Sequence, residues 1–208
     1  MIPTMTLIKK DDILKVNGSI YLSEKIQNPQ KNAEMKLELS VKPEKIFYKL
    51  FCIQKKQSPE SSRLDFFHLK EFPDGIFLEK KDDGTYHCYI FELKFTGSND
   101  LKKLTRQLFS GYIHCKTLLS VLDIDYRSTE ISFHVVCVQE NSKQSEFNRI
   151  KPAKKFIVGK PLNNNSDFDE WLSNRLIYRA GEYKKVLNIE KIFLKTTDDY
   201  TYYNKLEI

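Results

Sequence analysis

Apolar and polar residues alternate along much of the first half of the chain, which is the side-chain pattern of β-strands. In residues 34–41 (EMKLELSV) every second residue is apolar, and residues 45–54 (KIFYKLFCIQ) gather apolar side chains on one parity. A period of two residues is typical of a strand with one buried face. Because Pro43 lies in the short turn between these runs, we expect the two strands to form a hairpin.

A second hairpin is predicted over residues 72–94 (FPDGIFLEKKDDGTYHCYIFELK), with strands at about 74–80 and 86–95. A two-residue loop would place the carboxylates of Asp74 and Glu92 on opposite faces. A three-residue loop at 82–84 (DDG), with its glycine in the left-handed conformation, pairs Asp74 with Glu92 and brings their Cβ atoms to about 5 Å. We therefore predict that Asp74, Glu92 and Lys94 share one face, and that a helix covers the other.

The longest apolar pattern lies in residues 98–123 (SNDLKKLTRQLFSGYIHCKTLLSVLD). Spacings of three and four between its apolar residues predict an amphipathic helix of five or six turns, capped by Ser98 or Asn99. Residues 131–139 (ISFHVVCVQ) follow as a buried strand, so a crossover and a parallel strand pair are expected. Residues 166–178 predict a second helix capped by Ser166, and residues 186–197 a strand. The tyrosine-rich tail either adds another strand or packs as a loop.

The composition is that of a globular protein, since 40% of the 208 residues are hydrophobic and 12% are aromatic. No apolar run approaches the roughly 20 residues that cross a bilayer, and the N-terminus lacks a signal-peptide pattern. We expect one domain over residues 1–208, cytoplasmic and without a membrane partner. The four cysteines stand singly and are expected to be reduced core thiols rather than zinc ligands: Cys52, Cys88, Cys115 and Cys137.

The net charge of +6 is unevenly placed. Residues 141–160 hold six basic side chains against one acid, Glu146. Such a segment can neutralise several phosphates and so attract nucleic acid in a salt-dependent way. The alternative is a solvated loop in a lysine-rich protein.

The predicted face of the second hairpin carries the chemistry. Two carboxylates as close as those of Asp74 and Glu92 repel each other, and a divalent cation relieves the repulsion. Mg²⁺, with Mn²⁺ as an alternative, takes oxygen ligands and fills its shell with water and substrate phosphate. The ion can activate a bound water and stabilise the leaving oxygen, while Lys94 offsets negative charge in the transition state. Asp74 and Glu92 as metal ligands, with Lys94 beside them, suffice for phosphodiester hydrolysis, although such charges taken singly are usually only surface charges.

Pro73-Asp74 followed by Glu92-Leu93-Lys94 resembles the motif of the PD-(D/E)XK nuclease superfamily, which includes RecB-like and restriction-endonuclease-like proteins. The order of elements also agrees over about residues 60–140. The resemblance implies an α/β fold with a restriction-endonuclease-like core, a mixed central sheet flanked by helices. The rest of the single nuclease-like domain would be an N-terminal β-rich extension and a C-terminal helix and strand.

Within the predicted long helix, RQLFSGY at 106–112 resembles the glutamine motif of the RecB-type branch, with one extra residue between Gln107 and Tyr112. The resemblance implies that Gln107 supports the active site and that Tyr112 contacts the site or the substrate, although Tyr112 also fits the apolar face. The chain departs from the family in two ways. The gap between Asp74 and Glu92 is long, and no upstream helix offers the usual metal-binding glutamate, so Glu34, Glu38 and Asp65 remain candidates.

Three functions are compatible with these patterns. The first is a magnesium-dependent nuclease for repair, restriction or defence, acting on DNA because most relatives with this motif cut DNA. Its phosphate contacts would come from Lys102, Lys103, Arg106, Lys151, Lys154 and Lys155. The second is a catalytically inactive subunit or adaptor on the same fold. The third is an unrelated β-rich nucleic-acid-binding protein in which Tyr200, Tyr202 and Tyr203 stack bases. Because the chain is small, a homodimer or partner protein is a candidate means of targeting.

Overall fold

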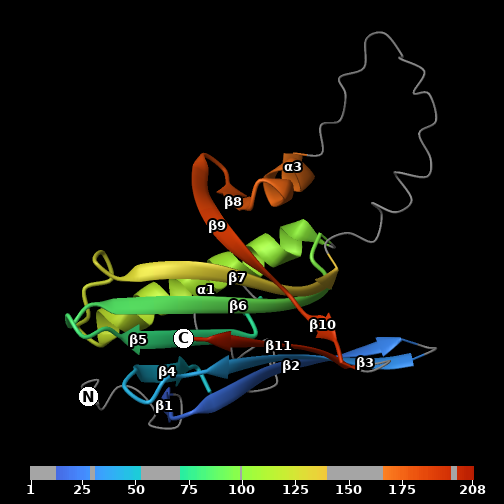
Figure 1. The fold of residues 1–208 in the computed structure, drawn as a ribbon. Helices are drawn as coiled ribbons and strands as arrows, with labels where there is room; N and C mark the ends of the chain where they lie inside the picture. The colour runs from blue at the N-terminus through green and yellow to red at the C-terminus, as the bar shows by residue number, and fades with distance from the viewer. Residues whose placement is uncertain (1–12, 29–30, 53–70, 99, 140–165, 198–200) are drawn as a thin grey trace.

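A computed structural model describes residues 13–28, 31–52, 71–98, 100–139, 166–197 and 201–208. In these residues the fold is mixed α/β, consisting mostly of strands with few helices (Figure 1). Two sheets are present, and each contains both parallel and antiparallel pairs. The expectation of an α/β protein with a mixed central sheet is therefore confirmed at this level. No described helix has the length and apolarity to cross a membrane.

The larger sheet has seven strands in the order β1-β4-β5-β6-β7-β9-β8. Their bounds are β1 Ile13–Val16, β4 Ile46–Leu50, β5 Gly75–Lys80, β6 Tyr86–Thr96, β7 Glu130–Gln139, β8 Arg175–Ala180 and β9 Tyr183–Phe193. The three neighbouring strands β6, β7 and β9 are parallel, while the remaining pairs are antiparallel. The predicted crossover from β6 through a helix to a parallel β7 is thus confirmed.

The smaller sheet has four strands in the order β10-β11-β3-β2. It consists of β2 Ser19–Asn28, β3 Lys31–Ser40, β10 Lys195–Thr196 and β11 Thr201–Glu207. The C-terminal tail is therefore a strand, parallel to β3. An apolar cluster lies between the two sheets, with Met35, Leu37 and Leu39 from β3 facing Phe77 of β5 and Phe91 of β6.

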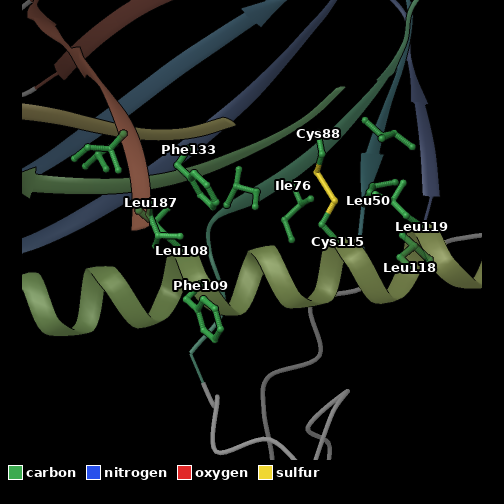
Figure 2. Close-up of a cluster of buried hydrophobic side chains, with 14 of the residues drawn as sticks. Leu50, Ile76, Cys88, Leu108, Phe109, Cys115, Leu118, Leu119, Phe133 and Leu187 are labelled. Atoms are coloured by element: carbon green, nitrogen blue, oxygen red, sulfur yellow. A yellow bond between two sulfur atoms is a disulfide. The ribbon is translucent and has the colours of Figure 1, made fainter. Parts of the chain in front are cut away.

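Helix α1, Leu101–Val121, covers the other face of the seven-stranded sheet. Its cap is Asp100, one residue after the predicted positions, and the Asp100 carboxylate accepts a hydrogen bond from the backbone N–H of Lys103. Leu108, Cys115 and Leu119 point from α1 toward the sheet (Figure 2). The α1 core residues meet the even-numbered side chains of the hairpin: Ile76, Leu78, Cys88 and Ile90.

The hairpin of β5 and β6 has the predicted register. Ile76 pairs with Ile90 and Leu78 with Cys88. Lys81 N–H donates to the Thr85 carbonyl and Gly84 has φ +83°, so residues 82–84 form the expected three-residue loop with a left-handed glycine. The helix, however, lies on the face of Cys88 and Ile90, which by strand parity is also the face of Glu92 and Lys94, so the prediction that it covers the opposite face is wrong. The opposite face is covered by the four-stranded sheet instead.

Two other predictions, one about strand pairing and one about a helix, are wrong. β3 and β4 do not form a hairpin, because β3 joins the smaller sheet and β4 the larger one. The expected helix at 166–178 is shorter: α3 spans Ser166–Leu172, Asn174 adopts a left-handed φ of 57°, and the chain continues as β8. Leu176, which lies within the predicted helix range, is a buried residue of β8.

One cysteine pair also differs from expectation. The structure joins Cys88 of β6 to Cys115 of α1 in a disulfide (Figure 2). The two cysteines are separated by 27 positions, and only the packing of α1 on β6 brings them together. The expectation of four reduced thiols is therefore wrong for this pair.

Gly111 sets how closely α1 approaches the sheet. A Cβ atom at this position would lie 2.8 Å from Cγ of Pro73 and 2.9 Å from Cγ2 of Ile90. Neither neighbour is the end of a flexible side chain, so a side chain at 111 would push α1 away from β6 and from the segment that enters β5.

We expect Gly111→Ala to destabilise the protein by roughly 1–3 kcal/mol, because overpacking outweighs the better helix propensity of alanine. Urea unfolding followed by circular dichroism measures the change. The control is Ser120→Ala at an exposed position of the same helix, which should stay within about 0.5 kcal/mol of the parent. A Gly111→Ala protein as stable as the parent would contradict the close packing.

Candidate functional site

Asp74 lies where the chain enters β5. Gly75, the first residue of β5, pairs with Phe91, so β6 continues past the start of its neighbour. The Asp74 side chain reaches into this space, and its Oδ2 accepts a hydrogen bond of 2.7 Å from the backbone N–H of Leu93. This bond fixes the carboxylate beside the strand segment that carries Glu92 and Lys94.

Glu92 and Lys94 project from β6 on the α1 side. Only 1% of Glu92 is exposed, and Lys94 Nζ donates to Glu92 Oε1 at 2.5 Å. The second oxygen, Oε2, is buried with no hydrogen-bond partner among the described residues. A buried carboxylate with only one of its two oxygens satisfied is costly, so this position is unusual for a residue of purely structural role.

Glu24 is a third carboxylate of the site, and the sequence analysis missed it. It belongs to β2 in the smaller sheet, yet its electrostatic environment includes Asp74, Lys94 and Lys103. Gly75 allows this approach, since a Cβ there would lie 2.9 Å from Leu22 Cδ2 on β2. Glu24 lies two residues after the buried Leu22 and so on the same face of β2, which is the sequence feature that could have identified it. No strand was predicted at 19–28.

The upstream glutamates suggested by the sequence lie elsewhere. Glu34 forms an ion pair with Lys36 at 3.0 Å. Glu38 accepts hydrogen bonds from Ser19 at 2.7 Å and from the hydroxyl of Tyr203. Asp65 lies outside the described residues. Among the described carboxylates upstream of the hairpin, Glu24 is the one whose charge interacts with both Asp74 and Glu92.

Gln107 comes to the site from α1. Along the contact between α1 and β6, Cys115 meets Cys88, and the surface of Gly111 meets Ile90. Four helical residues advance about 6 Å and two strand residues about 6.6 Å, so the next pair in this series is Gln107 and Glu92. Gln107 is buried, and its Oε1 has no hydrogen-bond partner among the described residues.

The basic residues of α1 differ in whether their charge interacts with the carboxylates of the site. Lys103 is exposed, and its charge interacts with Asp74 and Glu24, which places it at the edge of the site. Arg106 instead forms an ion pair with Glu71 at 2.7 Å, which ties α1 to the segment leading into Asp74. Lys102 is exposed. Lys151, Lys154 and Lys155 lie outside the described residues.

Tyr112 does not lie beside the carboxylates of the candidate site. Five residues along a helix rotate the side-chain direction by about 140°, so Tyr112 lies on the flank of α1 away from Gln107. Its neighbours are Phe109, Phe133, Lys116 and Lys185. The tyrosines proposed from the sequence for base stacking are engaged as well, since Tyr202 packs on Phe95 and Tyr203 donates to Glu38. Tyr200 lies outside the described residues.

Burial dominates the electrostatics of the carboxylates. It raises the pKa of Glu92 to about 8, with the Asp74 carboxylate adding to the rise and Lys94 opposing it. Burial likewise raises the pKa of Asp74 against the Leu93 N–H and the ammonium groups of Lys94 and Lys103. It also raises the pKa of Glu24, again with a contribution from Asp74. All three carboxylates are thus harder to ionise than in water, as expected for acids sharing a buried site.

The residues fit a hard divalent cation. Buried oxygens of Glu24, Glu92 and Gln107 have no donor among the described residues, and oxygen ligands are those that Mg²⁺ prefers. A cation would stabilise the ionised carboxylates that burial disfavours. Within the described ranges, no three His, Cys, Asp or Glu side chains are already gathered tightly enough to hold a metal ion together. Asp74 and Glu92, with Glu24 nearby, would be the ligands, with solvent and substrate supplying further oxygens.

The raised pKa of Glu92 gives a pH-dependent stability. The folded pKa of about 8 exceeds the ordinary 4.5, so this group stabilises the fold below about pH 4.5 and the contribution is lost as pH rises through 8. Because glutamine resembles the neutral acid, Glu92→Gln should be more stable than the parent at pH 9 in EDTA, by roughly 1–3 kcal/mol.

Urea unfolding at pH 5 and pH 9 measures this difference, with the exposed Glu44→Gln as control. The gain should shrink toward zero at pH 5 and should be absent from the control. An equal effect of Glu92→Gln at both pH values would show that the carboxylate is ionised throughout the range.

Comparison with known proteins was made at three levels. No family model matches this chain, nor does any curated protein or solved structure.

Proposed function

We propose that this chain is a magnesium-dependent nuclease that hydrolyses phosphodiester bonds in DNA, with a restriction-endonuclease-like core in a single domain and the PD-(D/E)XK motif formed by Asp74, Glu92 and Lys94. The observation that carries the proposal is the pair of the half-buried Asp74 and the buried Glu92, where β6 runs past the start of β5. Glu92 Oε2 has no hydrogen-bond partner among the described residues, and Lys94 donates to Glu92 Oε1. The parity argument from the sequence and the observed hairpin register both support this arrangement.

Charge balance favours a phosphodiester as the substrate. Asp74, Glu92 and Glu24 together carry three negative charges when ionised, while Lys94 and Lys103 carry two positive charges. Adding one Mg²⁺ leaves the site with one net positive charge, which attracts the anionic phosphate. Without the cation this net positive charge is absent.

Each residue of the site then has a distinct part. Asp74 and Glu92 hold the cation, which when bound polarises the phosphate and lowers the pKa of a coordinated water. The Lys94 ammonium, already oriented by Glu92 Oε1, stabilises negative charge that develops on the phosphate oxygens. Gln107, which comes from α1, orients the Glu92 carboxylate. Lys103 attracts the DNA backbone at the edge of the site.

Cleavage assays test the proposal directly. Labelled linear, circular and single-stranded DNA, and RNA, are incubated with Mg²⁺, Mn²⁺ or EDTA. We expect metal-dependent cleavage of DNA, reduced roughly a hundredfold or more in Glu92→Gln and in Lys94→Met, because each removes a charge from the reacting centre. Glu34→Gln, which alters a carboxylate outside the site, should cleave like the parent.

Activity that survives both substitutions would show that the site is elsewhere. Binding without cleavage under every metal condition would instead support an inactive nuclease-fold subunit or adaptor.

Glu24 should raise the affinity for the cation without being indispensable, since it comes from a separate sheet. We expect Glu24→Gln to increase the Mg²⁺ concentration needed for half-maximal cleavage by roughly tenfold, while excess Mg²⁺ restores most of the rate. Titration of the cleavage rate with Mg²⁺ measures this shift, with Glu34→Gln as the matched control. A rate loss that no Mg²⁺ concentration restores would assign Glu24 a different part.

A further inference from the structure

A cluster of aromatic and basic side chains lies on the flank of α1 away from Gln107, where α1 meets the β8–β9 hairpin. We call it the aromatic–lysine surface, and it consists of Phe109, Tyr112, Lys116, Tyr178, Tyr183 and Lys185. None of these residues takes part in the candidate site. The surface therefore needs an explanation of its own.

The β8–β9 hairpin passes from core to solvent along one face. Leu176 pairs with Leu187 at its buried end, Tyr178 pairs with Lys185 in the middle, and Ala180 pairs with Tyr183 at its tip. The two leucines are buried against α1, whereas 50% of Tyr183 is exposed. Tyr178 stacks on Phe109 with ring centres 3.8 Å apart and an interplanar angle of 9°, and Tyr183 lies beside the same phenyl ring at 5.9 Å. Tyr178 and Tyr183 thus both lie against Phe109, and Tyr183 is the exposed end of this aromatic cluster.

Lysine side chains lie against the neighbouring ring. The ammonium groups of Lys116 and Lys185 are 5.0 and 4.8 Å from the centre of the Tyr112 ring, and Lys116 Nζ donates to the Tyr112 hydroxyl at 3.1 Å. Neither lysine forms an ion pair with a carboxylate in the described ranges, and neither does the exposed Lys184 next to them. The ammonium groups of Lys116 and Lys185 thus lie against the Tyr112 ring, and no carboxylate of the described residues neutralises them.

This combination matches one class of partner. Unpaired ammonium groups attract a polyanion, and an open aromatic ring beside a rigid stack offers a surface on which an unpaired base can stack. A duplex keeps its bases inside and would use only the lysines. We propose that the aromatic–lysine surface binds single-stranded nucleic acid, with a base on Tyr183 and backbone phosphates on Lys116 and Lys185.

The proposal rests on the proposed nuclease function for its biological sense, because it names single-stranded nucleic acid as a substrate or as the product strand held after cutting. Tyr112 and Gln107 lie on opposite flanks of α1, so a strand bound at the surface could reach the site only by crossing the helix.

Equilibrium binding tests the surface without requiring cleavage. Fluorescence anisotropy of labelled oligothymidylate is measured in EDTA on the Glu92→Gln background. We expect Tyr183→Ala to weaken binding roughly fivefold or more, because stacking on the ring is lost, and Tyr183→Phe to bind within about twofold of the parent. Lys185→Gln should make the slope of log affinity against log salt shallower by about 0.7, the value for one phosphate contact on a single strand.

Matched control variants distinguish binding at this surface from nonspecific binding elsewhere on the protein. Tyr21→Ala removes an equally exposed tyrosine (56%) on β2, and Lys42→Gln removes an exposed lysine between β3 and β4. Both should bind like the parent. If Tyr183→Ala and Lys185→Gln also bind like the parent, the proposal is overturned.

The two proposals fail separately. Loss of binding in Tyr183→Ala together with no cleavage by the parent protein would support the surface and refute the nuclease. Metal-dependent cleavage with unchanged binding in Tyr183→Ala would do the reverse.

Discussion

The burial of the Glu92 carboxylate beneath α1 is the constraint on which the rest of the site depends. A carboxylate with 1% exposure has lost its hydration, and in this fold it receives one ammonium group in exchange. Burial and the neighbouring Asp74 together outweigh Lys94, which is why the pKa of Glu92 rises to about 8. Such an arrangement costs stability at neutral pH, and the proposed divalent cation would offset that cost by stabilising the ionised carboxylate.

Close backbone packing at two glycines brings three separate layers to that carboxylate. Gly111 lets α1 lie against Ile90 and Pro73, and Gly75 lets Leu22 of β2 approach the start of β5. As a result Gln107 arrives from the helix, Asp74 from the sheet and Glu24 from the second sheet. The Asp74 carboxylate, bonded to the Leu93 N–H, occupies the space left because β6 is longer than β5. The site is therefore a product of strand ends and small residues.

The lysines of the candidate site and those of the aromatic–lysine surface lie on two different flanks of α1. Lys103 belongs to the carboxylate flank, while Lys116 belongs to the aromatic flank together with Lys185 from β9. On the first flank the lysines face acids, and on the second they face rings. Since an ammonium group beside an acid is largely neutralised and one beside a ring is not, the two flanks are suited to different parts of an anionic ligand.

The sequence by itself determined the local features of this protein. The three-residue loop at 82–84 fixed the hairpin register, so the pairing of Ile76 with Ile90 and of Leu78 with Cys88 could be predicted, as could the long helix and the parallel strand after it. Only the tertiary structure decided which layer covers each face, which sheet β3 and β4 join, that Cys88 meets Cys115, that Tyr112 leaves the site, and that Glu24 enters it. Side-chain periodicity reports that a face is buried, because burial has a local signature two or four residues long. It does not report what buries that face, because the partner lies tens of residues away and is chosen by packing across the whole chain.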